Sequence, residues 1–254
     1  MTSSILGNLV SKSLPPSELL SAIAVSAAML LVLTLLKLPI SLSNCTLGAF
    51  VGAALASSTG LKISSLVEIV GSWVVAPFAC AFLSFMIYEI VIRLEESKPL
   101  VSIIRANRIA LVAVVFLVSF MLGANNLGLI QSFVVSMGNQ ELSNIIELFL
   151  FISAALGIVM FGKSIAQVVG DKIVGLSQIK TFAAMLSATI LILIMTAASI
   201  PVSLTQVIIG GMLGAGVSRR PWRINSREIG ILISSWALVT IISAGLGFLV
   251  SHFA

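Results

Sequence analysis

The chain has 254 residues, of which 59% are hydrophobic and 9% are charged, and its formal net charge is +5. Soluble domains carry about 25% charged residues, so this composition excludes an ordinary soluble protein and predicts an all-α, polytopic membrane protein. A membrane-spanning helix needs about 20 apolar residues, which leaves room for roughly eight segments. The basic residues lie in short stretches between apolar runs, so they indicate membrane topology rather than binding to nucleic acid.

The apolar segments are predicted in chain order from the polar and charged residues between them. They are Leu19–Leu36, Pro39–Ser57, Leu66–Ile92, Ile109–Met137, Leu148–Phe161, 181–199, Pro201–Val217 and Ile229–Val250. The second and seventh contain proline, serine and several glycines, so we expect broken helices there, which a membrane tolerates only where protein or a cavity satisfies the backbone.

Charge bias predicts the orientation of these segments. Residues 93–108 are predicted to form a basic loop, and the loop before the last helix carries Arg219, Arg220, Arg223 and Arg227. The positive-inside rule places both in the cytoplasm. Residues 138–147 carry two glutamates and no Lys or Arg, so they are assigned to the outer side together with His252.

A duplication organises the chain. The sequence Pro39-Ile40-Ser41-Leu42-Ser43-Asn44 recurs 162 residues later as Pro201-Val202-Ser203-Leu204-Thr205-Gln206, and two glycines follow each copy at the same spacing. Ser72-Trp73 and Ser235-Trp236 correspond at an offset of 163. The charge bias orients the two copies in opposite directions, and inverted-topology repeats with broken helices are typical of secondary transporters.

The duplication defines three parts of the chain: a first repeat over 1–92, the cytoplasmic loop 93–108 and a second repeat over 109–254. The first repeat is expected to be incomplete, because nothing before it corresponds to the opening helices of the second. Two explanations stay open: the start of the protein is assigned too late in the sequence, or the chain is one half of a transporter that works with another chain.

The motifs together resemble those of the inorganic phosphate transporter (PiT) family. That family has a G-A-N-D-x-x-N-A pattern and a P-x-S-x-T-H or P-x-S-x-T-Q segment in each repeat. Here Gly123-Ala124-Asn125-Asn126 matches, with Asn126 at the aspartate position and Leu129 at the later asparagine position. The resemblance covers nearly the whole chain and implies a multi-pass permease of the cell membrane that couples phosphate to a proton or sodium ion. The family also includes sulfate permeases.

An oxyanion at membrane depth needs hydrogen-bond donors and a positive field, which hydroxyls, amides and helix N-termini supply. The expected anion contacts are Ser41, Ser43, Asn44, Ser203, Thr205 and Gln206, with Asn125 and Asn126 lining the same cavity. A sodium site is placed near the two asparagines, whose alternative role is to cross-link helices. Pro39 and Pro201 are expected in the first turn of the half-helices.

Three classes of function are compared at this point. Phosphate is the first choice of substrate and sulfate the second, because hydroxyl and amide donors satisfy either ion. A non-transporting subunit that pairs with a partner chain is the second class, and association of identical chains stays open. An intramembrane enzyme is not expected, since the apolar segments contain no acid–base pair or metal cluster, and no cofactor is predicted. Cys45 and Cys80 are interpreted as packing residues.

Overall fold

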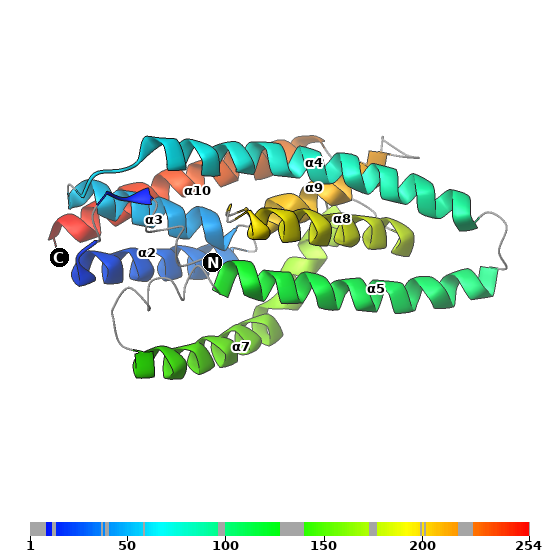
Figure 1. Ribbon diagram of the computed structural model, residues 1–254, viewed down its shortest axis with the longest axis horizontal. Helices are drawn as coiled ribbons and strands as arrows, with labels where there is room; N and C mark the ends of the chain where they lie inside the picture. The colour runs from blue at the N-terminus through cyan, green and yellow to red at the C-terminus, as the bar shows by residue number, and fades with distance from the viewer. Residues whose placement is uncertain are drawn as a thin grey trace.

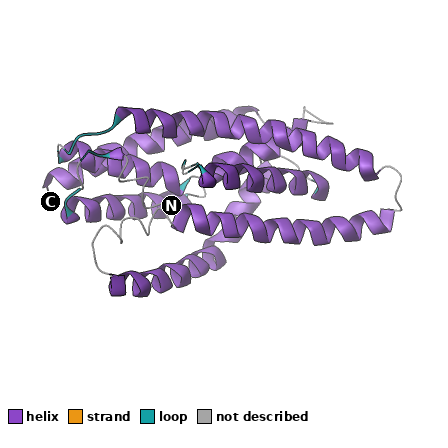
Figure 2. Ribbon diagram, in the orientation of Figure 1, coloured by secondary structure: helices purple, strands orange, loops and turns teal. Residues whose placement is uncertain are grey.

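The computed structural model describes residues 9–11, 14–36, 38, 41–57, 59–95, 100–127, 140–172, 177–198, 200, 202–217 and 226–253. Their regular elements are helical, apart from one isolated bridge between Val10 and Leu61. The elements are α2 (Pro16–Leu35), α3 (Leu42–Ala56), α4 (Ile63–Glu95), α5 (Leu100–Leu122), the π-helix η1 (Gly123–Leu127), α7 (Gln140–Lys172), α8 (Gln178–Ala197), α9 (Leu204–Val217) and α10 (Ser226–Phe253). Most of them run along one long axis (Figures 1 and 2).

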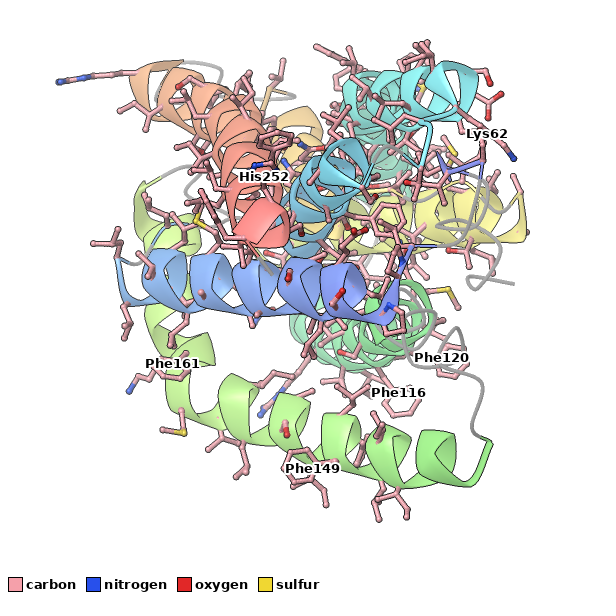
Figure 3. All side chains as sticks on the ribbon, turned by 90° about the vertical axis from the view of Figure 1, so that its left-hand side faces the viewer. Lys62, Phe116, Phe120, Phe149, Phe161 and His252 are labelled. Atoms are coloured by element: carbon pink, nitrogen blue, oxygen red, sulfur yellow. The ribbon has the colours of Figure 1, made fainter. Side chains whose placement is uncertain are left out.

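The helices divide into spanning and shorter segments. Among the described residues, five helices are long and apolar enough to cross a membrane, and three shorter apolar helices cover Leu42–Ala56, Leu148–Lys163 and Leu204–Val217. Figure 3 shows Phe116, Phe120 and Phe149 projecting from α5 and α7, and each is more than 60% exposed. Large apolar side chains on the outside suit a lipid solvent. The chain is therefore a multi-pass, all-α membrane protein, and the expected number of segments is confirmed.

Several helices extend beyond the predicted boundaries. α7 begins at Gln140, although polar residues before Leu148 predict a loop, and α5 begins at Leu100, so Arg105 and Arg108 belong to a helix rather than to a loop. Gln, Glu, Lys and Arg are good helix formers. These polar residues show that a stretch lies outside the lipid core, but they do not end the helix.

The two broken helices confirm the expected interruption. α3 has 15 residues and α9 has 14, which gives each a length of about 22 Å at 1.5 Å per residue, short of the roughly 30 Å hydrocarbon core. Both begin near the middle of the bundle and run toward opposite ends (Figure 1).

The helix starts correct the expected place of the prolines. α3 begins at Leu42 after the N-cap residue Ser41, whose φ of −91° and ψ of 133° are extended, and α9 begins at Leu204. Pro39 and Pro201 therefore precede the first turns instead of occupying them, and they lie outside the described residues. For α9 the physical reason is that Ser203 caps the helix with its side chain, as a strongly preferred N-cap residue does.

The long helix that follows the broken helix of each repeat packs against the broken helix of the other repeat, so the two repeats exchange α4 and α10. A side chain at Gly48 or Gly52 of α3 would collide with the α10 backbone at Thr240 or Ala244. In the same way, Gly210 and Gly214 of α9 lie directly against Pro77 and Ala81 of α4. Both contacts lie at the same offset of 163 along the long helices, Pro77 to Thr240 and Ala81 to Ala244. The duplication seen in the sequence is therefore a duplication of packing.

The first turns of α4 and α10 pack against the broken helix of their own repeat. Trp73 of α4 belongs to a packed cluster with Leu47 and Phe50 of α3. Trp236 of α10 belongs to a cluster with Ile209 and Met212 of α9. α4 and α10 thus cross from one half of the molecule to the other near their tryptophans, and they run in opposite directions (Figure 1), as inverted repeats require.

Candidate functional site

The starts of α3 and α9 are the most polar part of the interior. Ser41, Ser43 and Asn44 are 3%, 5% and 1% exposed, and Ser203 and Gln206 are 1% and 4% exposed. Thr205 is half-buried. The structure therefore buries all but one of the predicted hydroxyl and amide contacts, and it brings them toward the middle of the bundle from the two opposed repeats.

The start of α9 is a capped helix terminus. The backbone N–H of Gln206 donates to Ser203 Oγ at 3.3 Å, which satisfies one of the N–H groups that a helix start leaves without an intrahelical acceptor. The Ser203 hydroxyl accepts in this bond, so its own proton remains able to donate. The side-chain oxygen of Gln206 is buried without a hydrogen-bond partner.

The start of α3 has the same residue pattern but a different set of bonds. The Ser41 side chain makes no capping hydrogen bond, so the first-turn N–H groups stay available for another acceptor. Asn44 Nδ2 donates to the backbone oxygen of Trp236 at 3.2 Å, which ties α3 to α10. Asn44 Oδ1 is buried and, like the Gln206 oxygen, has no partner.

The asparagine motif lies beside the second repeat's site. Asn125 is 4% exposed, and its Nδ2 donates to the backbone oxygen of Val202 at 3.3 Å, directly before α9. Asn126 is half-buried. The motif falls in η1, and single-turn π-helices are frequent at functional sites. Asn125 therefore cross-links two segments, which was the alternative role for this residue, and it does so at the predicted site.

The chemistry of the site is that of neutral donors and acceptors. Each helix start contributes about half a positive charge, and the hydroxyls and free N–H groups can donate to an oxyanion. The unpartnered oxygens of Asn44 and Gln206 are hard ligands of the kind that alkali and alkaline-earth cations prefer. Among the described residues, no group of three or more His, Cys, Asp or Glu could hold a metal ion.

A known protein family has the sequence pattern of this chain. The phosphate transporter family matches the chain over residues 2–109 and again over residues 102–247. The chain belongs to the phosphate transporter family. The two matches divide the chain close to the boundary between the two sequence repeats, so the family's pattern occurs once on each side of it.

Individual relatives match most of this chain, and the chain spans about three quarters of their own length. A Methanocaldococcus jannaschii protein named "putative phosphate permease" is 28% identical over 236 residues, 93% of this chain and 75% of that protein. The probable low-affinity inorganic phosphate transporter of Bacillus subtilis is 26% identical over 90% of this chain and 72% of its own length. The solved structure of a sodium-dependent phosphate transporter has the same fold, with a TM-score of 0.84 over 98% of this chain and 83% of that one, at 20% identity.

Three side chains near these helices were not singled out as site residues. Trp73 Nε1 and Trp236 Nε1 are buried without hydrogen-bond partners, and the recurrence of Ser-Trp at an offset of 163 was the signal that could have identified them. Lys180 donates to the backbone oxygen of Gly216 at 3.2 Å, at the far end of α9. No sequence motif marks Lys180, because its partner is a backbone atom.

Proposed function

We propose that this chain carries inorganic phosphate across the membrane, bound between the starts of α3 and α9 and coupled to a cation. The observation that carries the proposal is the pair of buried helix starts, one from each inverted repeat, with serine hydroxyls at both. The names of the two relatives described above, a phosphate permease and a phosphate transporter, support phosphate as the substrate. Alternating access would follow from movement of the two helix-exchanged halves around this site.

Sodium is the coupling ion that the donor set favours over a proton. The buried oxygens of Asn44 and Gln206 lack partners, and the half-buried Asn126 lies next to Asn125 on η1. Such neutral oxygens bind a cation but carry no proton. If sodium binds near the asparagines, Asn126→Asp adds a negative ligand and should lower the sodium concentration for half-maximal uptake by about tenfold. An unchanged sodium dependence, with a proton gradient sufficient for uptake, would exclude this coupling.

The decisive experiment is uptake of radiolabelled phosphate into proteoliposomes that contain this chain alone, with sodium and proton gradients imposed in turn. The double variant Ser203→Ala, Thr205→Ala should lower uptake at low phosphate by about a hundredfold or more, since hydrogen bonds to a charged ligand contribute about 1.5–3 kcal/mol each. The matched control is Ser234→Ala, because Ser234 is exposed and donates to carbonyls of its own helix.

Sulfate is the second candidate substrate. A sulfate permease of Bacillus subtilis is 24% identical over 89% of this chain and 64% of its own length, and the neutral donors of the site suit either ion. Unlabelled sulfate added to the same assay ranks the two anions. If unlabelled sulfate suppresses the uptake at a lower concentration than unlabelled phosphate does, sulfate would become the assigned substrate. No uptake by well-folded protein would overturn the stand-alone carrier and favour a subunit that needs a partner chain.

A further inference from the structure

Trp73 and Trp236 are equivalent residues of the two repeats, and their indole N–H groups are unusual. The two side chains are 9% and 8% exposed. In each, Nε1 is buried and has no hydrogen-bond partner. Leaving a buried donor unpaired is unfavourable, and here it occurs twice at matching positions. Such a coincidence points to a missing partner rather than to a local packing defect.

Each tryptophan lies between the two broken helices. The backbone oxygen of Trp236 accepts from Asn44 of α3, while its side chain belongs to a cluster with Ile209 and Met212 of α9. Trp236 therefore lies beside the start of one broken helix and packs with the other.

Trp73 has the mirrored arrangement. Gly210 and Gly214 of α9 meet Pro77 and Ala81 of α4 in the same chain order, so the two helices run parallel at this contact. One turn earlier, this register places Gln206 beside Trp73. The ring of Trp73 belongs to the cluster of α3.

The chemistry of indole limits what the missing partner can be. Indole Nε1–H is a donor only, so its partner must be an acceptor, and no cation can fill this role. The candidates are the oxygens of an oxyanion or of water. A tetrahedral oxyanion carries oxygens on all sides, so a single ion between the two helix starts has acceptors to offer to both repeats.

We propose that Trp73 and Trp236 each donate their indole N–H to the translocated oxyanion, as specificity-determining residues that complement the hydroxyls of the helix starts. The inference rests on the proposed function, because it assumes that an oxyanion occupies the space between α3 and α9. The two indoles add neutral donors without adding charge. A site built in this way holds the anion in a buried environment and still leaves its charge to be balanced by the coupling cation.

The first test replaces tryptophan by benzothienylalanine at position 73 or 236, which keeps the ring shape and substitutes sulfur for the N–H. Each replacement should raise the KM for phosphate by about ten- to hundredfold, as expected for the loss of one hydrogen bond to a charged ligand. The matched control is 5-fluorotryptophan at the same position, which retains the N–H and should leave the KM within about twofold.

The second test does not depend on transport. With isotope-labelled indole nitrogens in detergent-solubilised protein, titration with inorganic phosphate should shift the N–H resonances of Trp73 and Trp236 downfield, whereas chloride should not. Resonances that phosphate leaves unmoved, in protein that takes up phosphate normally, would overturn the inference and assign water as the partner. Absent uptake with unmoved resonances would instead count against the proposed function itself, so the two failures are distinguishable.

Discussion

The two broken helices share one frame but are held differently at their ends. α9 is capped by Ser203 at its start, and at its far end Lys180 bonds to the Gly216 oxygen. α3 has no side-chain cap at its start, and at its far end the hydroxyls of Ser57 and Thr59 donate to the Ala54 oxygen. The comparison shows that the duplicated frame of glycines and exchanged helices is retained, while the polar ends of the half-helices have diverged.

The difference has a functional meaning. The start of α9 is restrained by its own cap and by Asn125, which bonds to Val202. The start of α3 is tied to α10 through Asn44, which bonds to Trp236. The first turn of α3 therefore has N–H groups that no side-chain cap satisfies, whereas the start of α9 is capped by Ser203.

The largest effect is expected where the two repeats agree. Gly52→Ala and Gly214→Ala each place a methyl group against a backbone carbonyl of the exchanged helix. Overpacking against atoms that cannot rotate away reaches the upper end of the usual range, about 3 kcal/mol or more, so both variants should lower the thermal unfolding temperature by several degrees and by similar amounts. Gly245→Ala is the control, since a Cβ there meets nothing within 4 Å. Unequal losses would show that the two interfaces are not equivalent.

A smaller effect is expected from the asparagine of η1. Asn125→Ala removes the bond from Nδ2 to the Val202 oxygen, which should cost about 1–3 kcal/mol because a buried acceptor loses its donor. The shift of the thermal midpoint in detergent measures this cost. Ser119→Ala, at an exposed position of α5, serves as the reference. A midpoint that equals the reference would mean that the second repeat is not restrained by η1.

Alanine variants of Ser41 and Ser203, the residues before α3 and α9, should differ in stability but agree in their effect on phosphate binding. Ser203→Ala loses a capping bond and should destabilise the protein by about 1 kcal/mol. Ser41→Ala should leave stability nearly unchanged, because Ser41 makes no such bond. Both variants should raise the KM for phosphate. Equal destabilisation by the two substitutions, measured by thermal unfolding, would contradict the described difference between the helix starts.

The smallest effect is expected at Lys180, whose ammonium lies 5.6 Å from the centre of the Tyr88 ring and bonds to Gly216. Lys180→Met should cost less than about 1 kcal/mol, the usual contribution of one cation–π contact or one favourable helix-end charge. Lys180→Glu introduces the residue that the first repeat has at the matching position, Glu18. It should cost more, since a carboxylate there faces the negative end of α9.

Several features could be predicted from the sequence because they depend on composition and local pattern. The apolar runs predict the spanning helices, and the repeated Pro-x-Ser segments predict the two interruptions. Polar residues such as Ser41, Asn44 and Gln206 in apolar runs predict a buried polar site, because lipid cannot solvate them. The predicted helix starts were wrong, because the helices begin after the serines and not at the prolines. The residue at which a helix begins depends on backbone geometry that the sequence pattern does not determine.

The exchange of α4 and α10 was decided by the tertiary structure alone. The spacing of Gly48 and Gly52 predicts a close helix contact, yet nothing local indicates that the partner is Thr240, 192 residues away. Residues along a helix are related by a fixed geometry, so periodicity and charge determine which stretches span and in which direction. Which helix covers which glycine is chosen by packing among many apolar faces that look alike in the sequence, and only the folded chain makes that choice.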